Sequence, residues 1–338
     1  MKILLCSHCF SPDIGGIETV SALLGSEFAR TGHDVRVITQ TAVSDGRTWP
    51  FQVIRKPSPR ELLKQTGWCD VFFQNNISLQ TAWATLLLRK PWVIAHQTWL
   101  TATDGRTTWH TRLKRVLLRF ATNIAISEAV AKHIGAKSVQ IGNPYDPEIF
   151  RMLPAGPRDR DLVFLGRLVS DKGADVLLRA LGDLRERSAT PTLTVIGGGP
   201  EVTALRALTE ELGLGAQVSF AGPQSGEALA AMLNRHRVLV VPSRWAEPFG
   251  VVALEGIACG CVVIGSEQGG LPSAIGQCGC LVPNGDPHAL ADAIERVLGD
   301  EQLQASYRSG AAEHLARHTV SAVAAAYLAV FNKAIRSP

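Results

Sequence analysis

The sequence lacks the patterns that mark a membrane-spanning or a dinucleotide-dependent protein. It has no uninterrupted run of about 18 apolar residues, the length that a transmembrane helix requires. The short apolar run Ile3–Cys6 predicts a strand rather than the core of a cleavable signal peptide. No Gly-x-Gly-x-x-Gly motif stands between a strand and a helix, which disfavours a nicotinamide-dependent dehydrogenase. We therefore expect a protein that does not span a membrane.

Neither the cysteines nor the charge favours a metal site or a nucleic-acid partner. The seven cysteines are an odd number and several lie in apolar runs, which predicts buried free thiols in a reducing compartment such as the cytoplasm. Cys259-x-Cys261 and Cys278-x-Cys280 differ from the Cys-x2-Cys spacing typical of zinc sites. Residues 1–150 contain 17 Lys and Arg against 11 Asp and Glu, or +6, and the remainder contains 17 against 19, or −2. A positive charge excess of this size does not indicate a nucleic-acid-binding protein.

The length and the pattern of the chain favour two domains of the α/β class. A chain of 338 residues is long for one compact core. Apolar strands alternate with amphipathic helices twice along the chain, and glycines stand at the strand ends. This alternation predicts two Rossmann-like domains that face each other across a cleft. The segment Pro154–Asp161, rich in Pro, Gly and charge, predicts the linker, so we expect domains at 1–154 and 155–318.

The segment Val238–Ile264 is the most informative part of the sequence. Val238–Val241 predicts a buried parallel strand, and a helix is expected from Gly250. A loop from the carboxyl end of such a strand to a helix N-terminus offers free backbone N–H groups to an anionic or polyhydroxylated ligand. Glu247 and Glu255 would be roughly 12 Å apart on a helix, which suits two parts of one extended ligand better than one acid/base pair. The alternative is a solvated glutamate beside an ordinary amphipathic helix.

Other polar residues follow predicted strands in both halves. Gly15 and Gly16 stand between the first strand and a helix, where they permit close approach of a ligand or form a tight turn without one. Arg167 and Lys172 follow a strand and offer cationic donors to a diphosphate, unless they are solvated loop residues. His96 ends a strand, where doubly wound sheets bind ligands, although a lone histidine is more often structural.

The segment Thr107–Phe120 is basic and amphipathic. Its apolar residues, which include Trp109 and Phe120, lie on one side of a helix, and four Lys or Arg side chains surround the other. Such a helix can lie on an anionic bilayer. The alternative is a packed helix with a solvated charged face. Both interpretations stay open at this point.

The stretch from Glu247 to Glu255, Glu-Pro-Phe-Gly-Val-Val-Ala-Leu-Glu, resembles the Glu-x7-Glu signature of the retaining glycosyltransferases of family 4, which have the GT-B fold. Ala258–Gly260, Gly269–Pro272 and Gly166–Gly173 are also similar to that family, and Asn143–Asp146 resembles its Asn-Gly-Val-Asp stretch. The resemblance implies two Rossmann-like domains and a carboxyl-terminal helix, 319–338, that packs back on the amino-terminal domain. It also implies retaining transfer of a sugar from a UDP- or GDP-sugar to a hydroxyl of a glycan, lipid-linked or small-molecule acceptor.

The resemblance also implies roles for individual residues. In the family, the first Glu of the signature faces the donor sugar and the second faces the ribose, while Arg and Lys hold the diphosphate and a histidine lies beside the reacting sugar. Catalytic roles therefore go to His96, Arg167, Lys172 and Glu247. Donor-binding roles go to Gly15, Gly16, Gly166, Arg167, Lys172, Gly197, Gly199, Phe220, Glu247, Pro248, Phe249, Gly250, Val251 and Glu255. We expect Glu18, Gln97, Thr98 and Trp99 to line the acceptor site.

No metal or other cofactor is expected. Asp159-Arg160-Asp161 mimics the metal-binding Asp-x-Asp motif of a different glycosyltransferase fold, but it lies in the predicted linker. Enzymes of the family often glycosylate lipid-linked acceptors, which agrees with a peripheral position at the inner face of the membrane. A nucleotide-sugar epimerase of similar fold and a nucleotide-sugar-binding protein without catalysis remain as alternatives.

Overall fold

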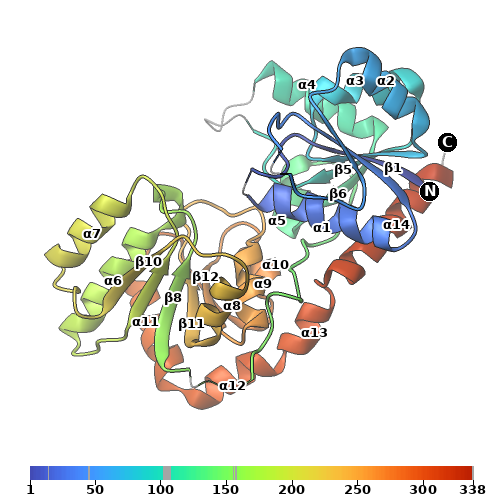
Figure 1. The fold of residues 1–338 in the computed structure, drawn as a ribbon. Coiled ribbons are helices and arrows are strands. Elements are labelled where there is room, and N and C mark those ends of the chain that lie inside the picture. The colour runs from blue at the N-terminus through green and yellow to red at the C-terminus, as the bar shows by residue number, and fades with distance from the viewer. Residues whose placement is uncertain (14, 45, 102–107, 155, 157, 337–338) are drawn as a thin grey trace. The chain divides into compact units, whose positions relative to one another are not determined.

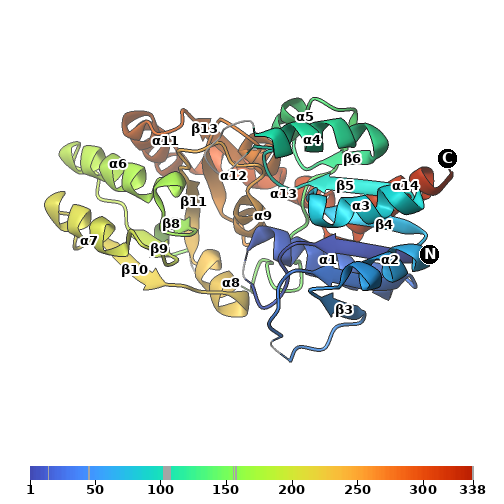
Figure 2. The same ribbon diagram turned by 90° about the horizontal axis from the view of Figure 1, so that it is seen from above.

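The computed structural model describes residues 1–13, 15–44, 46–101, 108–154, 156 and 158–336 and divides the chain into two compact units. One unit comprises Met1–Pro144 and Thr319–Pro338, and the other comprises Tyr145–His318. Each unit contains a parallel sheet between two layers of helices (Figures 1 and 2). The prediction of an α/β protein with two Rossmann-like domains is confirmed.

The first unit is built on a sheet with the strand order β3-β2-β1-β4-β5-β6-β7, in which all neighbours described are parallel. Its central strands are buried on both faces, which explains their continuous apolar sequences. The strands are β1 (Lys2–Ser7), β2 (Asp34–Thr39), β3 (Gln52–Arg55), β4 (Val71–Asn75), β5 (Trp92–His96), β6 (Thr122–Ala125) and β7 (Ser138–Gln140).

Helices cover both faces of this sheet. Figure 1 shows α2, α3 and α4 on one side of the sheet and α1 and α14 on the other. The helices are α1 (Gly16–Arg30), α2 (Pro59–Trp68), α3 (Leu79–Leu88), α4 (Trp109–Leu117), η1 (Leu118–Phe120), α5 (Glu128–Ile134) and α14 (Val320–Arg336). The predicted amphipathic segment therefore forms α4 and the short 3-10 helix η1, while Thr107 lies outside the described residues.

Helix α14 completes the core of the first unit. It buries Tyr327 and Phe331 against Phe28 of α1 and Phe73 of β4, with ring centroids 5.2–5.5 Å apart. Large aromatic side chains bury much apolar area and prefer such tilted and edge-to-face contacts. The last helix of the chain thus belongs to the same unit as the first strand.

The second unit has a sheet with the order β10-β9-β8-β11-β12-β13, again parallel throughout the pairs described. Its strands are β8 (Arg160–Leu165), β9 (Leu193–Ile196), β10 (Val218–Gly222), β11 (His236–Val241), β12 (Val262–Ser266) and β13 (Gly279–Val282). Its helices are η2 (Ser170–Lys172), α6 (Ala174–Glu186), α7 (Val202–Glu211), α8 (Gly226–Asn234), α9 (Val251–Ala258), α10 (Leu271–Ile275), α11 (Pro287–Gly299), α12 (Glu301–Ser309) and α13 (Ala311–Ala316).

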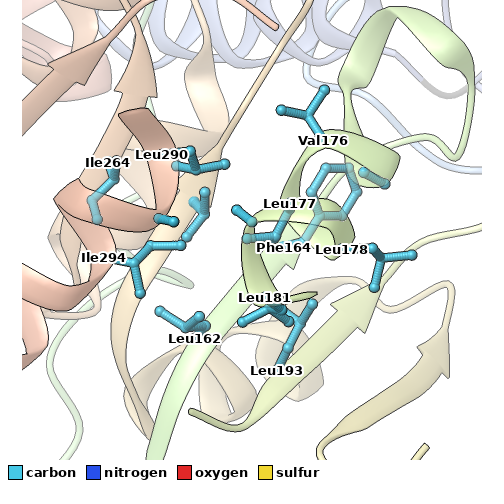
Figure 3. Packing of buried hydrophobic residues seen from close by; sticks show 14 of the residues in the cluster. Leu162, Phe164, Val176, Leu177, Leu178, Leu181, Leu193, Ile264, Leu290 and Ile294 are labelled. Atoms are coloured by element: carbon cyan, nitrogen blue, oxygen red, sulfur yellow. The ribbon is translucent and has the colours of Figure 1, made fainter. Parts of the chain in front are cut away.

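Leucine, isoleucine and valine side chains fill the core of the second unit. Figure 3 shows Leu177 and Leu181 of α6 on the side of that helix that faces Leu290 and Ile294 of α11. The amphipathic spacing of α6 places all of its leucines on this buried face. This core holds β8 and β11 at the centre of the sheet, and the loops that follow them form the candidate site.

The boundary between the units lies before Tyr145, whereas the sequence placed it after Pro154. The backbone N–H of Tyr145 donates to the carbonyl of His318 (3.0 Å), and that of Leu153 donates to Oδ1 of Asn234 (2.9 Å). These bonds tie the segment Tyr145–Leu153 to the second unit. The segment read as a linker also contains the first residues of β8. In the part of the chain that is described, no helix is long and apolar enough to cross a membrane.

Candidate functional site

The loops at the carboxyl edge of the second sheet are locked together by close backbone contacts. A Cβ atom on Gly197 would lie 1.8 Å from the carbonyl oxygen of Gly166, and one on Gly199 would lie 2.3 Å from that of Leu168. Gly197 has φ 141° and Gly199 has φ 159°, in the region that L side chains rarely adopt. Two of the glycines predicted to bind the donor are therefore required by the packing of the protein itself.

Glu247 lies at the centre of these loops. Its carboxylate forms an ion pair with Lys172 and accepts a hydrogen bond from Ser243 Oγ (2.7 Å). The Glu247 side chain is 12% exposed and the Lys172 side chain is 28% exposed. Its backbone is fixed as well, because Glu247 bridges to Gly269 and its carbonyl accepts from the N–H of Gly270 (2.6 Å). The structure thus brings together two residues that are 75 positions apart in sequence.

Three further hydrogen bonds hold the loop after β11. The N–H groups of Arg244 and Trp245 donate to the carbonyl of Asp171 (2.9 and 3.3 Å). Asn284 Nδ2 donates to the carbonyl of Ser243 (2.9 Å), and its Oδ1 accepts from the N–H of Gln268 (3.0 Å). Asn284 therefore connects the loops that follow β11 and β12. Lys172 and Glu247 are held as a fixed pair of charges.

Glu255 lies on α9, away from any ion pair among the described residues, and its side chain is half-buried. Burial, with a smaller contribution from the Asp146 carboxylate, raises the pKa of Glu255 from 4.5 to about 7. The helix begins after Gly250, which has φ 103° and leaves the first N–H groups of α9 without a side-chain cap. Near neutral pH the Glu255 carboxyl group is therefore partly protonated. In its ionised form it can accept hydrogen bonds from the hydroxyl groups of a ligand.

The remaining predicted donor residues differ in exposure. Arg167 is exposed and forms no ion pair within the described ranges. Phe249 is buried and its ring lies 5.6 Å from that of His318, which is a packing contact. The Phe220 ring packs under the Arg206 guanidinium (4.6 Å) and lines a cavity of about 200 Å³. Gly166 and Pro248 are half-buried in these loops, and Val251 is half-buried at the start of α9.

In the first unit, the Gly15-Gly16 turn leads into α1 as predicted. Gly15 precedes the helix without a side-chain cap, and a Cβ atom at Gly16 would meet nothing within 4 Å. The protein itself therefore does not require glycine at position 16. A Cβ atom at Gly15 would lie 2.4 Å from Oε2 of Glu18, a flexible side chain that can move. The free N–H groups at this helix start can bind an anion or a hydroxyl group.

His96 is buried at the carboxyl end of β5. Its Nε2 lies 3.0 Å from Oδ1 of Asn123 on β6. Burial lowers the pKa of His96, and the hydrogen bond to Asn123 raises it by less. Burial therefore favours the neutral imidazole at physiological pH.

The three predicted acceptor residues after His96 lie on the same loop. Gln97 is buried and its N–H donates to Oδ1 of Asn76 (3.0 Å), a residue with φ 76°. Thr98 is half-buried. The Trp99 ring packs edge-to-face on His133 (5.2 Å), so part of its surface is already used in packing.

The Asp-x-Asp sequence is engaged in contacts of its own. Asp159 pairs with Arg235 (2.6 Å), and Oδ2 of Asp161 accepts from the N–H and Oγ1 of Thr192 (both 2.9 Å). Among the residues with described positions, no group of three His, Cys, Asp or Glu side chains could hold a metal ion. All seven cysteines are free.

Residues 146–314, half of the chain, match the family described as glycosyl transferases group 1. The chain belongs to this family. It is 37% identical over 178 residues to the D-inositol 3-phosphate glycosyltransferase of Corynebacterium jeikeium, which covers 50% of this chain and 42% of that protein. The chain thus spans about two fifths of the length of this curated relative.

Solved structures with the same fold cover almost the whole chain. The Anabaena protein Alr3699/HepE, solved in complex with UDP, has a TM-score of 0.81 at 21% identity and covers 98% of this chain and 100% of its own. Sucrose-phosphate synthase from Thermosynechococcus elongatus has a TM-score of 0.79 at 22% identity, with 100% of both chains covered. These neighbours have the GT-B fold, in agreement with the two sheets described above.

Three polar residues of these sites were not found from the sequence: Ser243, Asn284 and Asn123. Ser243 lies two residues after the strand that the sequence did identify, so its position near a strand end was the available signal. Asn284 and Asn123 act through contacts with residues 41 and 27 positions away. No local pattern in the sequence marks such contacts.

Proposed function

We propose that this chain is a retaining glycosyltransferase that moves a sugar from a UDP- or GDP-sugar to an acceptor hydroxyl, without a catalytic metal. The observation that carries this proposal is the Lys172–Glu247–Ser243 group at the carboxyl edge of a Rossmann-like sheet. The ammonium group of Lys172 suits the diphosphate, and the carboxylate of Glu247 beside it suits the sugar attached to the diphosphate. The sequence similarity to inositol phosphate glycosyltransferases and the UDP found in HepE support the same donor class.

In the proposed reaction the bond between the anomeric carbon and the diphosphate oxygen breaks, and the acceptor oxygen forms the new bond on the same face of the sugar. The acceptor proton passes to the leaving diphosphate oxygen. Lys172 and the exposed Arg167 neutralise the negative charge that develops on the diphosphate. Glu247 accepts hydrogen bonds from the sugar hydroxyls, and Glu255 accepts them from the ribose. Catalysis then consists mainly of positioning and charge stabilisation.

A thermal-shift titration tests the donor site and identifies the nucleobase of the donor. UDP, GDP, ADP and NAD are titrated with EDTA present against wild type, Lys172→Ala and Glu255→Ala. A ligand at 100 times its Kd stabilises a protein by about 2.7 kcal/mol. We expect one nucleoside diphosphate to raise the melting temperature of wild type but not of the two variants. Arg179→Ala, which removes an exposed cation of α6, is the matched control and should respond like wild type.

Product analysis separates transfer from the two alternatives. Incubated with a UDP- or GDP-sugar and a mixture of hydroxyl acceptors, a transferase releases nucleoside diphosphate in an acceptor-dependent manner. An epimerase converts the donor sugar without any acceptor. A binding protein is stabilised by the donor but releases no nucleotide, and either of these results would overturn the proposal.

We further propose that the first unit docks on an anionic membrane. Trp109 and Phe120 are 67% and 66% exposed, and the cations Arg112, Arg115 and Arg119 are exposed on the same α4–η1 segment. The exposed Leu86, Leu87 and Leu88 at the end of α3 extend this surface, because Leu86 and Phe120 line one cavity of about 390 Å³. Apolar side chains beside cations favour the interface of a negatively charged bilayer.

Co-sedimentation with vesicles tests this docking. We expect the protein to bind phosphatidylcholine vesicles that contain phosphatidylglycerol and not vesicles of phosphatidylcholine alone. Trp109→Ser combined with Phe120→Ser should abolish binding. Met152→Ser in the second unit, which is also 67% exposed, should leave it unchanged. Equal binding by all three proteins, or none at low salt, would overturn the proposal.

A further inference from the structure

Two buried polar side chains meet where β5 and β6 pair in the first unit. His96 is 1% exposed and Asn123 is 4% exposed. The strands are parallel, and Asn123 stands opposite Ile94 in the register. The imidazole Nε2 and the amide Oδ1 are 3.0 Å apart. This is the one hydrogen bond of the His96 ring found among the described residues.

The surroundings of Asn123 fix the orientation of its amide. Nδ2 donates to the carbonyl oxygens of Leu118 (3.0 Å) and Ala121 (3.2 Å). If the amide were flipped, Oδ1 would face the carbonyl oxygens of Leu118 and Ala121. The three oxygens are all acceptors, so no hydrogen bond could form among them. A buried group left in that state costs about 1–3 kcal/mol. Oδ1 therefore faces the imidazole and acts as an acceptor.

The acceptor at Asn123 requires a proton on Nε2 of His96. In the other neutral tautomer, the lone pair of Nε2 would face Oδ1 at hydrogen-bond distance with no proton between them. Because burial disfavours the charged ring, the neutral form with the proton on Nε2 remains. Nδ1 then carries a lone pair and is an acceptor.

We propose that Asn123 is a positioning residue that holds His96 as the Nε2–H tautomer, so that Nδ1 accepts a hydrogen bond from a ligand hydroxyl. The tautomer follows from the contacts of Asn123 alone, whereas the ligand rests on the proposed transferase function. A neutral Nδ1 acceptor selects a hydroxyl of a sugar and rejects a fully ionised phosphate oxygen, which has no proton to donate. His96 is therefore matched to the sugar and not to the diphosphate.

NMR spectroscopy of the full chain labelled with 15N-histidine tests the tautomer without any ligand. The spectrum of His96→Gln assigns the ring among the nine histidines. At neutral pH we expect the chemical shift of an unprotonated nitrogen at Nδ1 and that of a protonated nitrogen at Nε2. A protonated Nδ1, or shifts averaged between the two tautomers, would overturn the proposal.

Two variants test the role of Asn123. In Asn123→Ala both neutral tautomers should be populated, so the two nitrogen shifts should move toward each other. In Asn123→Asp the carboxylate should hold a charged imidazole, with Nδ1 protonated as well. Unchanged His96 shifts in Asn123→Ala would show that another group fixes the tautomer. If neither variant folds, the wild-type spectrum still decides whether His96 is held as the Nε2–H tautomer, and any other result overturns the proposal. A correct tautomer in a chain that binds no nucleotide would contradict only the transferase function.

Discussion

The carboxyl edges of the two sheets carry different chemistry. In the second unit, a cation and a carboxylate form an ion pair at the strand ends, and a further carboxyl group with a raised pKa lies on α9. In the first unit, the buried polar groups near the corresponding edge are neutral: the His96–Asn123 pair, and a chain in which Asn75 Nδ2 donates to Ser21 Oγ (2.7 Å) and Ser21 donates to Ser7 (2.8 Å). Charged groups suit a diphosphate, and neutral donors and acceptors suit hydroxyl groups.

The glycines of the two edges differ as well. Gly197 of the second unit is required because its Cβ would meet the backbone of the neighbouring loop, whereas Gly16 of the first unit faces open space. Glycine at position 197 is therefore explained by packing within the second unit. For glycine at position 16 of the first unit, we propose that a ligand approaches the backbone.

The largest expected effect is on the free energy of unfolding of glycine variants. Gly197→Ala combines a φ of 141° with a contact of 1.8 Å to a backbone oxygen, so we expect a loss of about 3 kcal/mol or more. Gly16→Ala, at the start of α1, should change stability by less than about 1 kcal/mol. Urea denaturation measures both. Similar losses in the two variants would contradict the difference between the units.

Glu255 should make the stability of wild type depend on pH. Its folded pKa of about 7 exceeds its ordinary value of 4.5, so the folded state binds the proton more tightly. The ionised side chain therefore lowers the free energy of unfolding. This destabilisation is absent below pH 4.5, grows as the pH rises to 7 and is complete above it, at about 3 kcal/mol at most. Glu255→Gln should remove this decline, so its stability advantage over wild type should grow from pH 5 to pH 8 in urea denaturation. A constant difference would argue against a raised pKa.

The Lys172–Glu247 pair should show strong coupling. Lys172→Met leaves a nearly buried carboxylate without its cation, which should cost about 2 kcal/mol. The double variant Lys172→Met, Glu247→Gln removes both charges and should recover most of that loss. A double-mutant cycle by urea denaturation measures the coupling energy. Additive effects would mean that the pair does not form in solution.

The smallest effect is expected for an exposed pair in the same loops. Arg244 pairs with Asp175, and the two side chains are 47% and 25% exposed. Exposed ion pairs contribute about 0.2–1 kcal/mol, so Arg244→Ala should lower the free energy of unfolding by less than 1 kcal/mol. A loss equal to that of Lys172→Met would show that burial does not distinguish the two pairs.

The sequence predicted the fold because its signals are local. The apolar run at Val238–Val241 became part of β11, and Ser127 caps α5 by accepting from the N–H of Val130 (3.2 Å). Continuous apolar strands and capping residues can be recognised from a few consecutive residues of the sequence. The boundary between the units could not be placed, because the bonds of Tyr145 and Leu153 join residues far apart in sequence.

The candidate site was predicted only as a set of strand ends. The sequence placed Lys172 and Glu247 at the ends of two strands, but the contact between them depends on β8 and β11 being neighbours in the sheet. The hydrogen bond from Asn284 to Ser243 likewise depends on the tertiary arrangement of the second unit, and that between His96 and Asn123 depends on β5 and β6 being neighbours in the first sheet. The structural need for Gly197 also became visible only once the two loops were in contact.

The most direct test of the central claim is a calorimetric titration of UDP and GDP into wild type, Lys172→Met and the control Arg179→Met. If the charged edge of the second sheet binds the donor, one of the two nucleotides should bind wild type and Arg179→Met equally. The same nucleotide should bind Lys172→Met about 10- to 100-fold more weakly, because a charge-assisted hydrogen bond contributes about 1.5–3 kcal/mol. Equal affinity in all three proteins, or no binding to wild type, would contradict the claim.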